Sequence, residues 1–333
     1  MDKKFKVLDI FPQIDPESMK MLTDIAEVRT FALADCSGEK MLKEVRDVNA
    51  IILSSAGLVD AKVMENAPNL KVVGRAGAGY QNVDIEAATK RGIAVVFSGS
   101  ANSDTVADLT FGLILSVARN ISWADHTCKT TQDNKWDFGT GMKFMGTDVW
   151  NKTLGIIGFG KIGSRVAKRA RGFDMSILVY DPYLKEKGAK EEGCKYVDLP
   201  TLLKGSDFVT IHSPFTEETN KLIGEKEMKM MKDGAYIINA AFGGIIDEDA
   251  LYKALIEGKL GGAAIECPET KKGELTFNPQ KPIYRLKNVV LTPMLGGRTK
   301  ECGPRTARMM VEGVVKVLKG EKPTWIVNPS ILR

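Results

Sequence analysis

Histidine and patterned cysteine are both scarce in this 333-residue sequence, which contains only two histidines, His126 and His212. Because histidine is the most common proton carrier in enzymes, the scarcity leaves few residues for acid–base catalysis. The five cysteines are scattered and odd in number, and none has CxxC spacing. This pattern is typical of reduced thiols in a cytoplasm rather than of a disulfide framework, and it predicts no metal site.

Long apolar runs and blocks of like charge are also absent. No stretch reaches 18 apolar residues, so we expect no membrane span, and the start MDKKFKVLDIF lacks the apolar core of a signal peptide. The net charge of +5 is spread along the chain, which argues against a nucleic-acid partner. With 44% hydrophobic and 27% charged residues, the composition is that of a soluble globular protein, and the length suffices for two domains.

Short β-rich runs alternate with helical patterns in two successive parts of the chain. The strands expected in the first part are FKVLDIF, AIILSS, KVVGRAG and IAVVFS, and those in the second are TLGIIG, ILVYD, FVTIHS, AYIINAA, GGAAIE and NVVLTP. One long, mostly apolar helix is expected from about 103 to 129, and a final helix from about 300 to 319. The alternation predicts an α/β fold with parallel sheets covered by helices on both faces.

A GxGxxG pattern follows the first strand of the second part. Gly158 permits a tight turn, Gly160 lets the backbone approach a pyrophosphate, and Gly163 lets the next helix pack on the strand. The start of that helix offers free N–H groups to phosphates. The following strand ends in Asp181, whose carboxylate can accept hydrogen bonds from ribose hydroxyls and would repel a 2′-phosphate. The pattern therefore predicts a dinucleotide site that favours NAD over NADP.

Over nearly its whole length the sequence resembles the D-isomer-specific 2-hydroxyacid dehydrogenase family, and within it the phosphoglycerate dehydrogenase branch. The segments that carry the resemblance are GRAGAGYQNVDIEAATKRGI, NSDTVADLTFGLIL, KFMGTDVWNKTLGIIGFGKIG, HSPFTEETNKLIGEKEMKMMKDGAYIINAA, GGIIDEDAL and LTPMLGG. The resemblance implies two doubly wound, Rossmann-like domains: a flavodoxin-like substrate domain (1–101 and 300–333) and an inserted NAD-binding domain (102–299). It further implies a homodimer, with NAD in the cleft between the domains beside a small-molecule substrate.

The resemblance also assigns residues to the cofactor and to the substrate. Besides Asp181 and the three glycines, the residues expected around NAD are Lys161, Ile162, His212, Pro214, Ala240 and Glu266. The family usually has aspartate at the last of these positions. The residues expected around the substrate are Ser54, Arg75, Ala78, Gly79 and Tyr80. The phosphoglycerate enzymes tend to have an arginine at the first of these positions, and the backbone of Ala78 and Gly79 would bind a carboxylate.

The family's catalytic groups are an arginine, a histidine and a glutamate. The arginine lies in a segment resembling NxARGG, which reads NAAFGG here, so its position is Phe242. The histidine lies in PHxG, which reads PMLG here, so its position is Met294. The glutamate position becomes Lys271 without a gap, or Glu269 or Glu274 with one. The sequence therefore predicts that two catalytic groups are replaced by apolar side chains. Either the substrate is changed or less polar, or no hydride chemistry occurs.

Three functions remain compatible with this combination. The first is an oxidoreductase with a rebuilt site, whose acid or base would come from Tyr80, Asp104, Glu269, Lys271, Cys267 or Arg298. The second is an enzyme that retains NAD for elimination or epimerisation without net redox, with a buried lysine such as Lys271 as the base. The third is a catalytically inactive protein that responds to NAD(H). We expect neither histidine to restore the proton carrier, because His212 belongs to the cofactor motif and His126 lies at a surface or interface.

Overall fold

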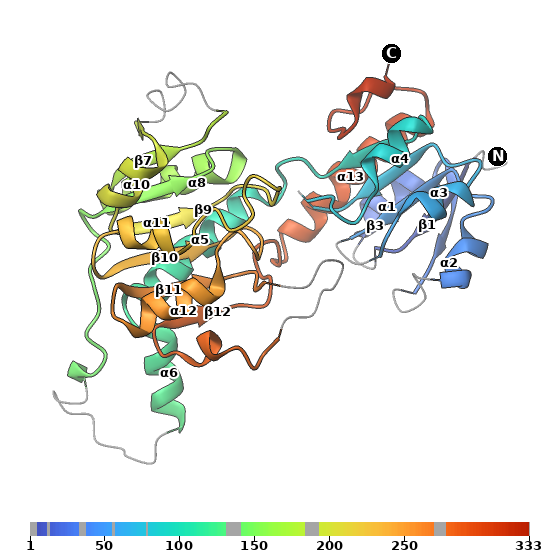
Figure 1. Ribbon diagram of the computed structural model, residues 1–333. Helices are drawn as coiled ribbons and strands as arrows, with labels where there is room; N and C mark the ends of the chain where they lie inside the picture. Colours follow the sequence, from blue (N-terminus) through green and yellow to red (C-terminus); the bar gives the residue numbers. More distant parts are fainter. Residues whose placement is uncertain are drawn as a thin grey trace. The chain divides into compact units, whose positions relative to one another are not determined.

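The computed structural model describes residues 5–11, 14–32, 38–54, 57–77, 79–130, 141–183, 193–269 and 278–332. The chain divides into two compact units (Figure 1). The discontinuous unit consists of Met1–Asn102 with Gly297–Arg333, and the continuous unit of Ser103–Gly296. Each unit has its own parallel sheet and its own hydrophobic clusters on both faces of that sheet.

The discontinuous unit is built on a five-stranded parallel sheet in the order β2-β1-β3-β4-β5, which is the strand order of flavodoxin-like folds. Its strands are β1 (Phe5–Asp9), β2 (Ala26–Thr30), β3 (Ala50–Leu53), β4 (Val72–Arg75) and β5 (Ala94–Phe97). Its helices are α1 (Pro16–Thr23), α2 (Gly38–Glu44), α3 (Ala61–Glu65), α4 (Ile85–Lys90), α13 (Cys302–Leu318) and the 3₁₀ turn η4 (Pro329–Ile331). Residues of α1 and α13 cover one face, and residues of α2, α3 and α4 the other.

Helix α13 belongs to this unit although it lies about 200 residues beyond the rest of it in the sequence. A glycine in β4 allows its close packing. A Cβ atom on Gly74 would lie 2.6 Å from Cγ2 of Val314 and 2.7 Å from the sulfur of Met310. No larger residue could replace Gly74 without moving the helix away from the sheet.

The continuous unit contains a seven-stranded parallel sheet in the order β12-β11-β10-β9-β6-β7-β8. Its strands are β6 (Thr153–Ile157), β7 (Ser176–Tyr180), β8 (Lys195–Tyr196), β9 (Phe208–Ile211), β10 (Ala235–Asn239), β11 (Leu260–Ile265) and β12 (Val289–Leu291). Its helices are α5 (Ser103–Ala118), α6 (Ile121–Thr130), α8 (Lys161–Ala170), α10 (Leu199–Gly205), α11 (Glu225–Met230) and α12 (Glu248–Ile256), with 3₁₀ turns η2 (Arg171–Phe173) and η3 (Pro282–Arg285). Helices α5 and α8 pack on one face and α10, α11 and α12 on the other.

The order of the central strands identifies the place where a ligand binds. Counted from β6, the sheet has the strand order 3-2-1-4-5-6 of a dinucleotide-binding fold, with β12 added at one edge. The chain reverses its direction of travel across the sheet at β6, so the crevice lies outside the carboxyl end of this strand. The predicted fold class, two doubly wound parallel-sheet domains, is confirmed.

Two local predictions were wrong or incomplete. The apolar stretch from 103 to 129 is two helices, because Asn120 has a left-handed backbone (φ 54°) between α5 and α6. Asparagine tolerates this conformation better than most residues, and its side-chain amide donates a hydrogen bond to the carbonyl of Met145 at 3.1 Å. Strands β2 and β8 were not predicted, because AEVRT and KY lack a buried apolar run.

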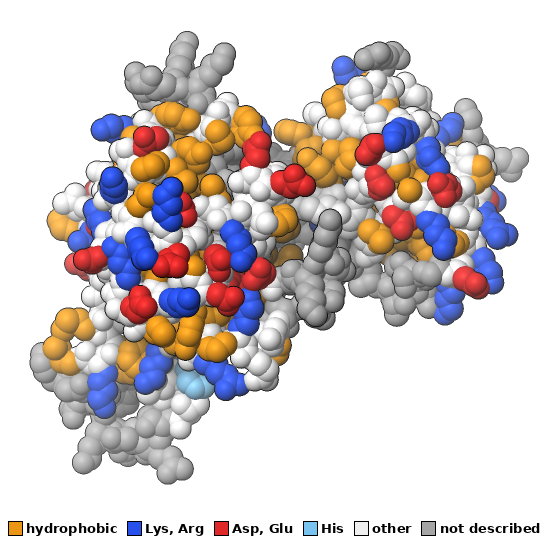
Figure 2. Space-filling model, in the orientation of Figure 1, with side chains coloured by type: hydrophobic (Ala, Val, Ile, Leu, Met, Phe, Trp, Pro, Cys, Tyr) orange, Lys and Arg blue, Asp and Glu red, His pale blue; other side chains and the backbone are white. Residues whose placement is uncertain are grey.

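Charges of both signs are interspersed on the described surface of each unit in the view of Figure 2. This distribution agrees with the absence of a like-charge block in the sequence. In the described parts of the chain, every helix is too short or too polar to cross a bilayer.

Asp9, the last residue of β1, is a carboxyl group in the core of the discontinuous unit, with 2% exposure. Its Oδ1 atom accepts a hydrogen bond from the N–H of Phe11 at 2.8 Å. Burial raises the pKa of Asp9 to about 6, and the hydrogen bond from Phe11 offsets this only in part. The folded protein therefore binds this proton more tightly than the unfolded chain, and stability falls as the pH rises from about 4 through 6.

The substitution Asp9→Asn should raise the free energy of unfolding at pH 8 by about 1–3 kcal/mol and change it little at pH 4. Asparagine keeps the acceptor for Phe11 and removes the buried charge. Urea unfolding followed by circular dichroism at both pH values measures the effect, and Asp24→Asn, at an exposed position, is the control. A gain of equal size at both pH values would show that ionisation of Asp9 is not the cause.

Candidate active site and cofactor site

The turn after β6 is closed by glycines that leave no space for side chains. Gly158 has φ 87°, and a Cβ atom there would lie 2.7 Å from the hydroxyl of Ser213 and 2.8 Å from the carbonyl carbon of His212. A Cβ on Gly163 would lie 2.2 Å from the carbonyl oxygen of Gly158. A Cβ on Gly160, in contrast, would meet nothing within 4 Å. The turn is therefore closely packed at Gly158 and Gly163, and it is open at Gly160, the glycine that would face a ligand.

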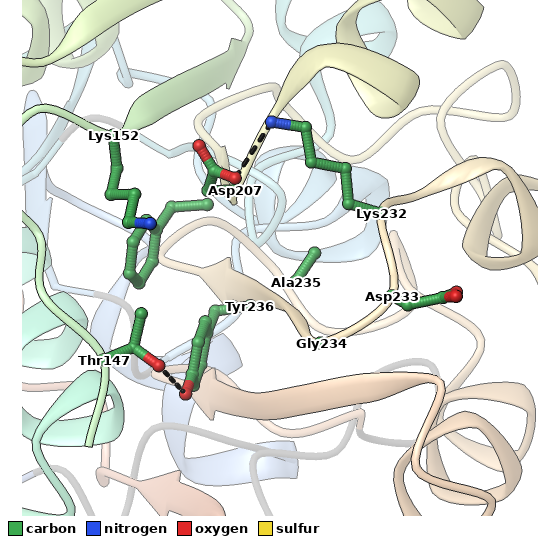
Figure 3. Close-up of a pocket in the computed structure, with 9 residues that line it drawn as sticks. Thr147, Lys152, Asp207, Lys232, Asp233, Gly234, Ala235 and Tyr236 are labelled. Atoms are coloured by element: carbon green, nitrogen blue, oxygen red, sulfur yellow. Dashed lines mark hydrogen bonds and ion pairs between the residues drawn. The ribbon is translucent and has the colours of Figure 1, made fainter.

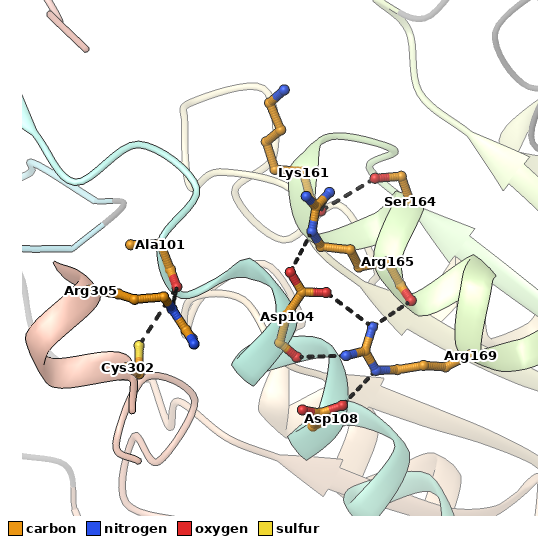
Figure 4. Close-up of polar contacts among 9 residues, drawn as sticks. All are labelled: Ala101, Asp104, Asp108, Lys161, Ser164, Arg165, Arg169, Cys302 and Arg305. Carbon is orange, nitrogen blue, oxygen red and sulfur yellow. Dashed lines mark hydrogen bonds and ion pairs between the residues drawn. The ribbon is translucent and has the colours of Figure 1, made fainter. Parts of the chain in front are cut away.

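The amino end of α8 is open for an anion. Gly160 is its N-cap residue and makes no side-chain capping bond, so N–H groups of the first turn, which includes Lys161 and Ile162, are available to a phosphate. Figure 4 shows the side chain of Lys161 extending away from the ion pair between Arg165 and Asp104. This end of α8 has the backbone arrangement that a pyrophosphate requires.

Asp181 follows β7 and is held beside the glycine turn. Its Oδ2 atom accepts a hydrogen bond from the N–H of Phe159 at 2.8 Å, and its Oδ1 atom from the N–H of Tyr183 at 2.9 Å. The hydroxyl of Tyr196 donates to the carbonyl oxygen of Asp181. The carboxylate is thereby oriented at the edge of the crevice, where it can also accept hydrogen bonds from a ribose.

His212, at the end of β9, is a neutral imidazole. Its Nε2 atom lies 3.0 Å from the hydroxyl of Thr210, and its buried Nδ1 atom has no partner among the described residues. Burial lowers the pKa of His212 to about 3. The ring is therefore uncharged at neutral pH and cannot act as an imidazolium acid. Pro214 begins the next loop, where its carbonyl oxygen accepts a hydrogen bond from Thr219 at 2.7 Å.

Three adjacent strands, β10, β11 and β12, end at the same edge of the sheet and carry the expected catalytic positions. After β10, the amide of Asn239 donates to the carbonyl of Phe242 at 2.9 Å, and its Oδ1 atom accepts from the N–H of Ala241 at 3.1 Å. This clamp shapes the turn that contains Ala240 and Phe242. The ring of Phe242 is half-buried against the hydrophobic cluster on that face of the sheet.

Glu266, directly after β11, connects this turn to the one after β12. Glu266 is 3% exposed, and its N–H donates to the carbonyl of Asn239 at 3.0 Å. Its carboxylate accepts hydrogen bonds from the hydroxyl of Thr292 and from the N–H of Gly296, the latter at 2.5 Å. Its carbonyl oxygen accepts from the N–H of Met294 at 3.1 Å. One residue thus fixes both ends of the turn that contains Met294.

Met294 has a left-handed backbone, with φ 56°, and its side chain is 39% exposed. This conformation is uncommon for a long side chain and more frequent for asparagine, aspartate and histidine. Strained positions of this kind cluster at functional sites. The backbone at this position therefore suits a histidine better than the methionine that occupies it.

The surroundings of Asp104 and Cys267 argue against both as the catalytic acid or base. Burial opposes ionisation of Asp104, but hydrogen bonds and charges of Arg165 and Arg169 outweigh it and lower the pKa of this carboxyl group (Figure 4). Asp104 lies 2.9 Å from Arg165, so it connects α5 to α8. Burial, together with the charge of Glu266, raises the pKa of Cys267 to about 12. The first is a structural carboxylate and the second an unreactive thiol.

The remaining candidates have different surroundings. Glu269 lies beside the turn after β10 and forms an ion pair with Lys281 at 2.8 Å. Tyr80 is 39% exposed and contacts Phe97 edge-on. Arg298 belongs to the discontinuous unit, and His126 is exposed on α6. Lys271, Glu274 and Ala78 lie outside the described residues.

In the discontinuous unit, the carboxyl end of the sheet holds a buried guanidinium. Arg75, at the end of β4, is 8% exposed, and no carboxylate of the described residues forms an ion pair with it. Burial lowers the pKa of Arg75 to about 10, so it remains charged at neutral pH. Its Nε atom lies 3.4 Å from Oδ1 of Asn82, whose amide donates to the carbonyl of Ser54 at 2.9 Å. Asn82 thus connects Arg75 to Ser54, both of which were predicted to lie near the substrate. The sequence analysis did not single out Asn82, although its place in the segment GYQNVD was a signal.

A hollow on the continuous unit lies at the opposite edge of the sheet (Figure 3). Lys152 precedes β6, Asp207 precedes β9, and Ala235 begins β10. Lys232 and Asp207 form an ion pair at 2.9 Å across it, and Thr147 and Tyr236 share a hydrogen bond of 3.0 Å. Because dinucleotides bind at the carboxyl ends of the strands, this hollow is not the cofactor site.

The strand order, the glycine turn and the open end of α8 define a dinucleotide-binding protein of the Rossmann type. Residues 111–296 match the family model described as D-isomer specific 2-hydroxyacid dehydrogenase, NAD binding domain. The chain is 40% identical to a glyoxylate reductase of Thermococcus litoralis over 322 residues, which are 96% of each protein. It therefore belongs to the D-isomer-specific 2-hydroxyacid dehydrogenase family and carries the NAD-binding domain of that family.

Two further comparisons agree with this membership. A D-3-phosphoglycerate dehydrogenase of Archaeoglobus fulgidus is 41% identical over 296 residues, which cover 89% of this chain and 54% of the relative. The chain thus spans about half the length of that protein. The crystal structure of TT0316 from Thermus thermophilus has a TM-score of 0.85 at 31% identity and covers 97% of this chain and 99% of its own.

The substitution Gly158→Ala should weaken NAD binding at least tenfold, because the added Cβ would meet backbone of the β9 loop and because φ 87° disfavours alanine. Isothermal titration with NAD and NADH measures the change. Gly172→Ala, where a Cβ meets nothing within 4 Å, is the matched control. Unchanged affinity in a folded Gly158→Ala protein would place the cofactor elsewhere.

Proposed function

We propose that the protein is an NAD-dependent oxidoreductase whose active site has been rebuilt around Phe242 and Met294. The observation that carries the proposal is a contrast along the carboxyl edge of the seven-stranded sheet, between the part at β6 and β7 and the part at β10 to β12. The β6–β7 end keeps the tight glycine turn, the open amino end of α8 and the oriented Asp181. The β10–β12 end presents a phenyl ring and a thioether. Retention of the first end indicates that the cofactor is used, and the second indicates that the substrate differs.

The residues that would hold NAD extend along this edge. The pyrophosphate would lie against Gly158, Gly160, Gly163, Lys161 and Ile162. The adenosine would lie between Asp181 and the His212–Pro214 segment, and the nicotinamide near Ala240 and Glu266. When bound, the cofactor accepts or donates a hydride at its nicotinamide ring. Both carboxylate oxygens of Glu266 accept hydrogen bonds from the protein itself, so we assign this residue a positioning role.

Residues 1–101 and 300–333, which make up most of the discontinuous unit, would bind the substrate, and residues 102–299 the cofactor. Arg75 supplies a desolvated positive charge at the carboxyl end of its sheet, which suits an anionic group of the substrate. Ser54, Ala78, Gly79 and Tyr80 complete the proposed substrate side. Arg75 would replace the family's missing arginine in binding the substrate anion. It would not replace that arginine in polarising the reacting group, because polarisation requires contact with that group.

The replaced positions would make reduction of a simple 2-oxo acid slow. Loss of a proton-transferring group typically costs 10²–10⁴-fold in rate, and loss of an oxyanion donor roughly 10²–10³-fold. The relative from Thermococcus litoralis is named a glyoxylate reductase. Glyoxylate is therefore the reference substrate against which the rebuilt site should be measured.

The first test is the state of the cofactor after purification. The protein is purified without added cofactor and denatured, and NAD and NADH in the supernatant are quantified; apo protein is then titrated with both. Exchangeable binding with micromolar or weaker affinity is expected for an ordinary dehydrogenase cycle. Stoichiometric NAD that resists dialysis would favour elimination or epimerisation without net redox. Exchangeable binding without turnover of any substrate would favour a protein that only senses NAD(H).

Restoring the family residues should create the ordinary activity. The double variant Phe242→Arg/Met294→His is expected to raise kcat/KM for glyoxylate with NADH at least tenfold, because it adds a cation and a proton carrier. The left-handed backbone at position 294 accommodates histidine. The control is Ala241→Arg/Leu295→His, which adds the same groups one position away; Leu295 is 39% exposed, as Met294 is. Equal rates in the two variants would mean that Phe242 and Met294 do not occupy the catalytic positions.

We also propose that the protein acts in the cytoplasm as a homodimer formed through the continuous unit. Large apolar side chains are exposed on and after α6, at Ile121, Met142, Met145 and Trp150. Helix α6 has no buried residue. A second subunit that packed against this helix would cover its exposed side chains and stabilise it. The scattered cysteines, none with CxxC spacing, support a reducing compartment.

A further inference from the structure

We propose that the group reduced at this site is a protonated imine, a C=N bond that carries a positive charge, rather than a neutral carbonyl. The inference rests on the proposed function, in which NADH supplies the hydride. Its basis is a set of side chains at the carboxyl edge of the continuous unit, Glu248, Glu269, Lys281 and Tyr284, called here the acidic cluster.

The acidic cluster is a connected network of short contacts. Glu248, the first residue of α12, is 4% exposed, and its Oε1 atom accepts the N–H of Glu269 at 2.7 Å. Its Oε2 atom lies 2.8 Å from Nζ of Lys281 and accepts the hydroxyl of Tyr284 at 2.7 Å. The same ammonium lies 2.8 Å from Oε2 of Glu269. Two carboxylates therefore share one lysine.

The cluster has a net negative charge. Burial disfavours the charged form of Lys281, but hydrogen bonds to Glu248 and Glu269 outweigh it and raise the pKa of this lysine, so it stays protonated. Burial and the hydrogen bond to Glu248 raise the pKa of Tyr284, so its phenol stays neutral. With both glutamates ionised, two negative charges and one positive charge leave a net charge of −1.

The cluster adjoins the turn that contains Phe242. A Cβ atom on Gly243 would lie 2.3 Å from the carbonyl oxygen of Pro268 and 2.7 Å from Cα of Glu269, so the segment with Glu269 lies directly on this turn. The Glu269 side chain is 37% exposed. Among the described residues, the charge of Glu269 also reaches Lys221, which is paired with Asp247 at 2.9 Å and adds no net positive charge. The described surroundings of Phe242 are thus apolar and anionic.

Such surroundings oppose reduction of a carbonyl. Hydride addition to C=O places a full negative charge on oxygen unless an acid supplies a proton in the same step. Met294 has no proton to give, His212 is held neutral, and the net charge of the acidic cluster raises the energy of a nearby alkoxide. An alkoxide would therefore form at the edge of the sheet that stabilises it least.

The same surroundings favour a protonated imine. The hydride leaves C4 of the dihydronicotinamide with its electron pair and forms a C–H bond at the imine carbon, while the π electrons of C=N become the lone pair of a neutral amine. NADH becomes NAD⁺, and no proton is needed in this step; the amine later takes one from water. The face of the Phe242 ring attracts a cation, whereas an arginine would repel it. The positive charge moves from substrate to nicotinamide and remains near the carboxylates.

The test uses the purified wild-type protein and a substrate pair that differs only in the reacting bond. NADH oxidation is followed at 340 nm with glyoxylate alone and with glyoxylate plus methylammonium chloride at pH 8.5, where part of the aldehyde is present as imine. We expect at least a tenfold faster rate with the amine, a rate that rises with its concentration, and N-methylglycine as the product by mass spectrometry.

Two results would overturn the inference, and they differ in what they say of the proposed function. Equal rates with and without methylammonium would show that the protein is a carbonyl reductase, so the proposed function would survive and the imine would not. No oxidation in either mixture, with NADH binding intact by titration, would also exclude the imine; activity of Phe242→Arg/Met294→His would then decide whether the site transfers hydride.

A series of variants tests whether the charge of the acidic cluster contributes to imine reduction. Glu269→Gln should lower kcat/KM for the imine roughly tenfold, with unchanged affinity for NADH, whereas Glu269→Asp should retain most of the activity. Glu225→Gln removes an exposed glutamate that pairs with Lys229 on α11 and is the matched control. Equal losses in the Gln and Asp variants of Glu269 would assign this residue to loop structure, and the electrostatic argument would fail.

Discussion

The close approach of backbone segments at Gly158 is the constraint on which the rest of the continuous unit depends. Gly158 contacts the start of the loop after β9, and its carbonyl oxygen leaves no room for a side chain on Gly163. The same contacts set where α8 begins and leave its first N–H groups uncovered. The backbone arrangement that a pyrophosphate requires is therefore a consequence of how β6, β9 and α8 pack.

The other end of the sheet edge depends on a single buried carboxylate. Glu266 binds the turn after β10 through its N–H, and the turn after β12 through its carbonyl and carboxylate oxygens. A buried carboxylate is stable only when its oxygens are satisfied, and here the protein itself satisfies them. The strained backbone of Met294 is held by this arrangement. The backbone at this position suits a histidine, although a methionine occupies it.

The two units differ in the sign of the charge that lies at the carboxyl ends of their strands. In the discontinuous unit, Arg75 is buried without a carboxylate partner among the described residues and suits an anion. In the continuous unit, the acidic cluster combines two carboxylates with one ammonium beside Phe242.

The sequence by itself determined the fold class and the dinucleotide motif, and it predicted two apolar replacements. These features depend on local patterns: strand and helix periodicity, glycine spacing and short anchored segments such as NAAFGG and PMLG. Periodicity failed where a local conformation decided the outcome, as at Asn120, which divides one apolar stretch into two helices.

Only the tertiary structure decided which charges are available. Asp104 and Glu269 look alike in the sequence, yet the first is paired with arginines of α8 and the second joins Glu248, Lys281 and Tyr284. Burial likewise distinguishes Arg75 and His212 from other residues of their type. Partners and solvent exposure depend on contacts between residues tens of positions apart, and the free energy of a charge depends on those contacts more than on its neighbours in sequence.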